Sequence, residues 1–98
     1  ILQGPLPAGV ACYNDDVAMA LLFAARTRGL DVPTEVALIG MDHTPLSRVT
    51  LPPLTTIEYD LHAAALHGTA GLLRSLGAGV PTPTLAPAEL SLVEGETA

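Results

Sequence analysis

Two short apolar runs in this chain each end in small polar side chains, and this pattern limits what the chain can form. Residues 36–40 lead into Asp42, and residues 9–13 lead into Asn14. Apolar runs of this length, bounded by turn residues, are typical of strands in a parallel sheet that helices cover. Ligands of such open sheets bind at the carboxyl ends of the strands. The sequence therefore predicts a polar pocket at that edge of the sheet.

Two helices are expected in the chain. Residues 16–28 place apolar side chains with a period near 3.6, and Asp15 or Asn14 can cap their start. The buried stripe predicted for this helix is Val17, Ala20, Leu21, Ala24 and Ala25. A second helix is predicted over residues 61–76, with a stripe of Leu61, Ala65, Gly68, Leu72 and Leu76. A glycine follows each predicted helix, as is common at helix ends.

The order of the predicted elements indicates an α/β fold. Three prolines keep residues 43–54 out of a helix and out of any central strand. A β-branched run follows at residues 55–59, and a last strand is expected at residues 90–93. The order β-α-β-β-α-β predicts a parallel sheet flanked by helices. Residues 81–88 are interpreted as a linker-like loop, and residues 94–98 as a polar tail.

The charge balance argues against nucleic-acid binding by this segment. The formal net charge is −6, and the positive charge comes from four scattered arginines without any lysine. Because contacts from clustered cations to phosphates dominate nucleic-acid affinity, these residues are not expected to bind DNA themselves. Any DNA-binding part of the protein is expected to lie outside them.

The composition also bears on the compartment. No apolar run is long enough to span a bilayer, and no basic region precedes an apolar stretch as in a signal peptide. The single cysteine, Cys12, excludes an internal disulfide and lies in an apolar strand pattern, so a buried structural thiol is expected. These features favour a cytoplasmic protein without membrane contact.

No residue pattern for catalysis or metal binding is present. The sequence lacks a nucleophile–base pattern, a glycine-rich phosphate loop and a Cys/His cluster. His62 and His67 lie five positions apart on a predicted helix, so they cannot share a metal and are expected to face solvent. Asp15, Asp16 and Asp42 could suggest paired carboxylates, but two of them suit a helix start. We expect no catalytic residue, no metal and no cofactor.

Three segments with a specific spacing carry a resemblance to a known family. They are Asn14–Ala18, Val36–Asp42 and Pro52–Ile57. Together they resemble the C-terminal part of the effector-binding domain of LacI/GalR-family transcription regulators, in register over roughly residues 8–95. The resemblance implies part of a two-lobed, periplasmic-binding-protein-like fold with the effector in the cleft. It also implies that residues 8–54 belong to the C-terminal lobe, that residues 55–98 hold a crossover strand, helix and last strand, and that the DNA-binding domain is absent.

Asn14 and Asp42 are the first candidates for ligand contact. An amide offers donors and an acceptor to sugar hydroxyls, and a carboxylate accepts strong charge-assisted hydrogen bonds. The alternatives are a helix cap for Asn14, and a solvated carboxylate or the cap of a short turn at 44–47 for Asp42. The resemblance implies effector contact for both residues. Asp15 can cap the helix in place of Asn14.

The resemblance implies further contacts as well. Tyr59 and Leu61 would pack on the effector ring, although Leu61 could equally be the first core residue of its helix. His43 stands where aspartate is commoner in the family, so no role is assigned to it. The implied dimer face comprises Ala18, Met19, Leu22 and Phe23 on the first helix, and Leu46, Val49 and Leu51 in the loop after Asp42.

The resulting interpretation is a binding protein rather than an enzyme. We expect a small-molecule effector that is a sugar or resembles one, a homodimer, and DNA contact only through the missing N-terminal domain. A periplasmic sugar-binding protein of a transporter shares the fold and is the alternative, but Pro52–Thr56 favours the regulator. A small α/β enzyme is the third and weakest hypothesis.

Overall fold

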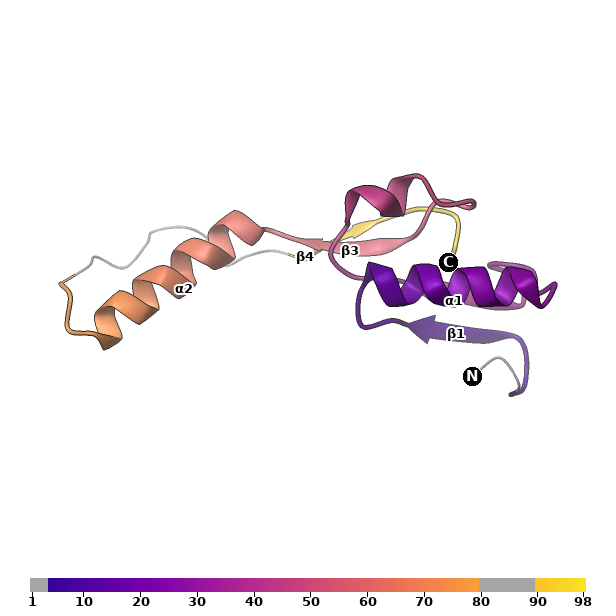
Figure 1. The fold of residues 1–98 in the computed structure, drawn as a ribbon, viewed down its shortest axis with the longest axis horizontal. Coiled ribbons are helices and arrows are strands. Elements are labelled where there is room, and N and C mark those ends of the chain that lie inside the picture. The colour runs from indigo at the N-terminus through magenta and orange to yellow at the C-terminus, as the bar shows by residue number, and fades with distance from the viewer. Residues whose placement is uncertain (1–3, 80–89) are drawn as a thin grey trace. The chain divides into compact units, whose positions relative to one another are not determined.

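The computed structural model describes residues 4–79 and 90–98 and separates into two compact units. One unit is Ile1–Glu58 with Ser91–Ala98, and the other is Tyr59–Leu90. The elements, drawn in Figure 1, are β1 (Ala8–Ala11), α1 (Asp15–Thr27), β2 (Val36–Ile39), the 3₁₀ turn η1 (Pro45–Arg48), β3 (Thr56–Tyr59), α2 (Leu61–Ser75) and β4 (Leu90–Val93). The predicted β-α-β-β-α-β order is confirmed. The assignment of residues 8–54 to a C-terminal lobe stays a prediction.

A parallel sheet forms the centre of the first unit. β1 and β2 pair in parallel, with Ala8 opposite Val36 and Ala11 opposite Ile39. A parallel bridge joins Ile39 to Thr55, immediately before β3, and β3 pairs with β4. α1 packs on β2 and lies alongside β1 in Figure 1. The apolar core lies between them and is built on Leu22, Val36 and Leu38.

Local hydrogen bonds set the ends of α1. The Asn14 Oδ1 accepts from the Val17 N–H at 2.9 Å, which satisfies one free donor of the first turn. Gly29 follows the last turn with φ of 73°, a conformation that costs glycine little. The Leu30 N–H then reaches back to the Ala25 O at 3.0 Å, which completes a Schellman ending. α2 ends in the same way at a glycine, as the sequence predicted.

The buried faces of both helices differ from the predicted stripes. In α1 the buried residues are Asp15, Ala18, Leu22 and Ala25, so only Ala25 was assigned correctly as buried. In α2 the buried residues are Ala63 and Ala70, which were not in the predicted stripe. Both helices carry alanine and leucine on several faces, so a period near 3.6 fits more than one stripe. The partner surface, which for α1 is the β1–β2 pair, decides which stripe is buried.

The last residues belong to the fold and are not a free polar tail. Thr97 is fully buried. Its Oγ1 donates to the Leu38 O and accepts from the Thr55 N–H, both at 2.8 Å. The Leu38 N–H donates in turn to the Thr97 O at 2.6 Å. The tail therefore continues the hydrogen bonding along the edge of β2.

Two sequence expectations concern regions outside this core. The loop predicted at residues 81–88 lies outside the described residues. Across residues 4–79 and 90–98, the structure has no helix that is both long and apolar enough to cross a membrane.

Candidate functional site

The loop after β2 contains two consecutive residues with left-handed backbone. Asp42 has φ of 107° and His43 has φ of 57°. Non-glycine residues seldom adopt this region, and each such residue costs about 1–3 kcal/mol, which interactions with its surroundings must offset. The Asp42 side chain is exposed. The loop therefore presents a carboxylate at the carboxyl end of β2, in a conformation that other groups must maintain.

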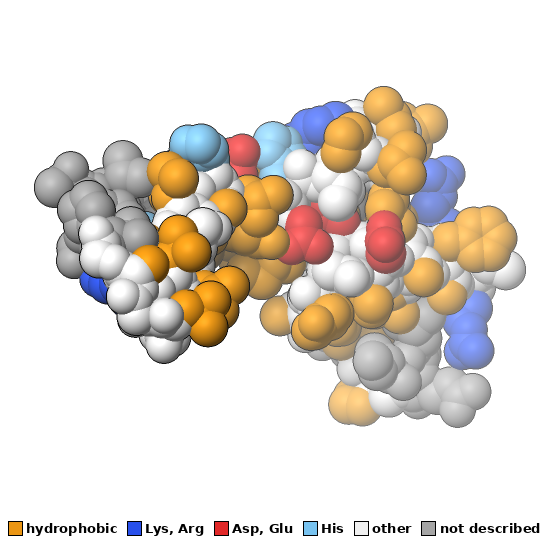
Figure 2. All heavy atoms as spheres, turned by 60° about the vertical axis from the view of Figure 1, so that its left-hand side comes forward, with side chains coloured by type: hydrophobic (Ala, Val, Ile, Leu, Met, Phe, Trp, Pro, Cys, Tyr) orange, Lys and Arg blue, Asp and Glu red, His pale blue; other side chains and the backbone are white. Residues whose placement is uncertain are grey.

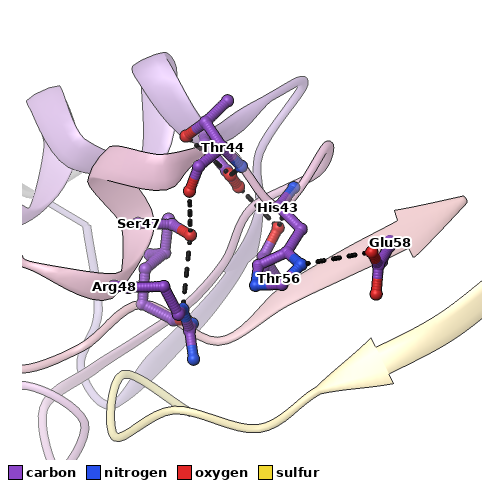
Figure 3. Close-up of polar contacts among 8 residues, drawn as sticks. His43, Thr44, Ser47, Arg48, Thr56 and Glu58 are labelled. Carbon is purple, nitrogen blue, oxygen red and sulfur yellow. Dashed lines mark hydrogen bonds and ion pairs between the residues drawn. The ribbon is translucent and has the colours of Figure 1, made fainter. Parts of the chain in front are cut away.

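Strand β3 holds the backbone of this loop. The Asp42 N–H donates to the Ile57 O at 2.9 Å, and the His43 N–H donates to the Thr56 Oγ1 at 3.4 Å. The His43 imidazole lies against Glu58, with 3.5 Å between Nδ1 and Oε1 (Figure 3). Asp42 and His43 thus have three partners on β3, and these contacts explain how their left-handed backbone persists.

Asp15 holds the same loop from α1. Its carboxylate is fully buried. Oδ2 accepts from the Thr44 N–H at 2.7 Å and from the Thr44 Oγ1 at 3.1 Å, and Oδ1 accepts from the Thr56 Oγ1 at 2.5 Å. The Asp15 N–H also donates to the Met41 O at 2.8 Å. The prediction that Asp15 caps α1 in place of Asn14 is therefore wrong, because its side chain serves the loop.

The sequence patterns contained a partial signal for this role of Asp15. Short polar residues follow β2, and Thr44 is one of them, whereas Thr56 opens the β-branched run that forms β3. Nothing in the sequence, however, separates a buried carboxylate from the exposed Asp16 beside it. The predicted buried stripe also omitted Asp15, so its function as a shared acceptor was missed.

The structure brings two of the four predicted ligand residues to one edge of the sheet. The Asp15 N–H donates to the Met41 O. Asn14 directly precedes Asp15 and therefore lies beside the start of the loop that carries Asp42. Asn14 caps α1, so the capping alternative is confirmed and its Oδ1 is occupied. Effector contact by Asn14 and Asp42 remains a prediction.

The other two predicted ligand residues lie in the second unit. Tyr59 ends β3 and is half-buried, and Leu61 opens α2. The Leu61 side chain is 67% exposed, so the alternative that it is the first core residue of the helix is wrong. Contact of Tyr59 and Leu61 with an effector likewise stays a prediction.

Side chains of η1 bond to main-chain carbonyls and fix this turn. Ser47 is buried, and its Oγ donates to the Thr44 O at 2.6 Å. The Arg48 guanidinium donates to the Leu54 O, and its Nε to the Ser47 Oγ at 3.4 Å (Figure 3). These bonds keep the turn directly after the left-handed loop in one conformation.

An apolar patch lies on the same unit. We define it as Phe23, Leu46, Val49 and Leu51, which are 74%, 60%, 71% and 73% exposed. A groove of about 480 Å³ is lined by Phe23, Leu51 and neighbouring residues, Met19 and Arg26 among them. Figure 2 shows hydrophobic side chains and arginines together at the surface of this unit. Four of the seven residues predicted for a dimer face are thus strongly exposed.

Two residues of the predicted dimer face belong to the core. Ala18 is fully buried and Leu22 is 4% exposed. Both lie on the side of α1 that packs on β2, so the expectation that Leu22 would be exposed beside Phe23 is wrong. Met19 is half-buried and lines the groove. The interface itself stays a prediction.

The remaining candidate groups carry no reactive arrangement. Burial raises the pKa of the Cys12 thiol, which packs half-buried against the core and stays protonated at neutral pH. His62 is exposed as expected, whereas His67 is half-buried with an Nε2 that has no hydrogen-bond partner among the described residues. The expectation that His67 faces solvent is therefore wrong. No group of three or more possible metal ligands occurs in residues 4–79 and 90–98.

Comparison with known proteins gives a consistent set of matches. The family model of the periplasmic binding protein-like domain matches residues 1–98. The transcriptional regulator MalR of Streptomyces coelicolor is 40% identical over 74 residues, which cover 76% of this chain and 21% of that protein. This chain spans about a fifth of the length of such relatives.

Solved structures agree with these sequence matches. A LacI family regulator from Lactobacillus casei with bound sucrose is similar with a TM-score of 0.76 and 29% identity, over 92% of this chain and 33% of that one. The lac repressor dimer bound to operator and an anti-inducer is similar with a TM-score of 0.73 and 31% identity, over 98% of this chain and 33% of that one.

Proposed function

This chain belongs to the family of periplasmic-binding-protein-like domains, with regulators of LacI/GalR type as its relatives, and we propose that it is the C-terminal part of such a regulator's effector-binding domain. The effector is a sugar or a sugar-like small molecule. The whole protein acts as a homodimer in the cytoplasm and contacts DNA through a domain outside these residues.

The observation that carries the proposal is the loop that presents Asp42 beside the start of α1. A carboxylate held at the carboxyl end of a parallel strand, close to an amide side chain, is suited to bind hydroxyl groups. The loop backbone is fixed by β3 and by Asp15, so little freedom is lost when a ligand binds. A sugar is the proposed ligand class because a similar regulator was solved with bound sucrose.

Binding rather than catalysis is the proposed work of this site. Asp42 is exposed, the described partner of the neighbouring His43 imidazole is Glu58 and not Asp42, and the Asp15 carboxylate is used entirely as a hydrogen-bond acceptor. The relatives are named transcriptional regulators, which supports a regulator over a transport protein. An effector that binds one conformation of the domain more tightly shifts the population toward it, and this shift would alter DNA affinity.

A thermal-shift screen of the full-length protein tests the proposed ligand class. We expect at least one sugar among sucrose, maltose, glucose and galactose to raise the unfolding temperature at millimolar concentration, because a ligand that binds only the folded state stabilises it. The stabilisation amounts to about 2.7 kcal/mol when the ligand is at a hundred times its Kd. If no mono- or disaccharide shifts the unfolding temperature, the carbohydrate assignment is contradicted.

A further inference from the structure

We propose that Asp15 is a positioning residue for the candidate site: its buried carboxylate holds the left-handed loop that presents Asp42. The functional meaning of this inference rests on the function proposed above, because Asp42 is the proposed ligand contact. The geometry concerns four parts of one unit: the start of α1, the loop after β2, β3 and Gly40.

The hydrogen bonds around Asp15 point toward the loop. All three described bonds to its carboxylate are accepted, two from Thr44 and one from the Thr56 hydroxyl. A side chain that only accepts matches an ionised carboxylate, which has no proton to donate. Bonds of this kind are among the stronger ones in proteins. The first turn of α1, at the positive end of the helix dipole, is also a favourable place for a buried negative charge.

The loop depends on these bonds because its backbone is strained at two consecutive residues. Thr44, which Asp15 holds through both its N–H and its hydroxyl, directly follows the left-handed pair Asp42 and His43. Thr56, which donates to Asp15, is also the acceptor for the His43 N–H. Loss of the carboxylate would release Thr44 directly and His43 indirectly. Asp42 would then no longer be held in a single orientation.

Gly40 shows that the chain leaves space for this carboxylate. A Cβ at residue 40 would overlap the Asp15 Oδ1 and lie 3.3 Å from the Asp15 Cα. Glycine is needed here for space and not for its backbone freedom, because no left-handed φ occurs at this position. The first residue after β2 must therefore be small, because the Asp15 side chain from α1 occupies the space beside it.

Hydrogen–deuterium exchange on the full-length protein without ligand tests the proposal. In Asp15→Asn, we expect the amides of Asp42, His43 and Thr44 to exchange at least about tenfold faster, since charge-assisted bonds are replaced by weaker ones. Asp16→Asn is the matched control, because it removes an exposed carboxylate from the next residue of α1 and should leave loop exchange unchanged.

Two further variants separate positioning from general stabilisation. Thr56→Val is nearly isosteric, keeps Asp15 and should accelerate exchange of the His43 and Thr44 amides even if Asp15→Asn folds poorly. Adding His43→Gly to Asp15→Asn should slow exchange at Asp42 and Thr44 again, because glycine adopts the left-handed region without strain. A purely structural role of Asp15 predicts no such rescue.

The outcomes are distinct. Faster exchange confined to residues 42–44, with rescue by His43→Gly, supports the positioning role. Uniform acceleration across α1, β2 and the loop, or no acceleration in Thr56→Val, overturns it. The exchange experiment contains no ligand, so its result does not depend on the thermal-shift screen. Failure of every sugar in that screen would contradict the proposed function alone.

Discussion

Gly95→Ala is expected to destabilise the protein by about 3 kcal/mol, although the change adds only one methyl group. A Cβ at residue 95 would lie 2.6 Å from the Leu54 C and 2.7 Å from the Leu54 O. Both atoms belong to the backbone, so no side-chain rotation can relieve the overlap. The tail must therefore move away from residues 53–55.

Movement of the tail would break several hydrogen bonds at once. The Gly95 N–H donates to the Thr55 Oγ1 at 3.0 Å, and the Glu96 N–H to the Pro53 O at 2.8 Å. The buried Thr97 would lose its bonds to β2, and unpaired buried polar groups are costly. Urea unfolding of the full-length protein measures the effect. Gly9→Ala is the control, because no atom lies within 4 Å of its new Cβ; equal stability of the two variants would contradict this role of the tail.

Phe23→Asp is expected to weaken dimerisation of the full-length protein by about thirtyfold or more, the loss typical of an interface hot spot. Phe23 is 74% exposed and lines a groove together with Leu51, another exposed member of the patch. Exposed apolar patches of this kind mark interaction sites. A charged side chain buried in such an interface would lose its hydration, whereas in the monomer it would remain in water.

Dilution experiments with light scattering distinguish an interface residue from a core residue. Phe23→Asp should give a folded monomer at concentrations where the unchanged protein is a dimer. Tyr13→Asp makes the same aromatic-to-aspartate change at an 86% exposed residue outside the patch and should remain dimeric. An unfolded Phe23→Asp variant, or a dimer of unchanged affinity, would show that this patch is not the interface.

The sequence was sufficient for the elements and their order, because local chemistry decides them. The apolar run at residues 36–40 contains β2. Asn14 caps the start of α1 and Gly29 follows its end, as the hydrogen-bonding preference of asparagine and the backbone freedom of glycine favour. The buried faces could not be predicted in the same way. Ala18 and Leu22 are buried because β2 lies beneath them, and that neighbour comes from a distant part of the chain.

The candidate site was predicted only in outline. Polar residues after β1 and β2 indicated the edge of the sheet, and the structure sets Asn14 beside the loop of Asp42. The left-handed backbone at Asp42 and His43 could not be predicted, because it depends on bonds to β3 and to Asp15. These bonds join residues up to 41 positions apart in the sequence.

Calorimetry with Asp42→Asn tests the central claim most directly. Asn14 is less suitable, because Asn14→Ala would also remove a helix cap worth about 1 kcal/mol. Titration uses the full-length protein and the sugar with the largest thermal shift, with Asp16→Asn as the control for loss of one exposed charge. We expect Asp42→Asn to raise the Kd about tenfold or more, because a hydrogen bond to a charged group contributes about 1.5–3 kcal/mol. An unchanged Kd in a folded Asp42→Asn protein would contradict the claim that this loop binds the effector.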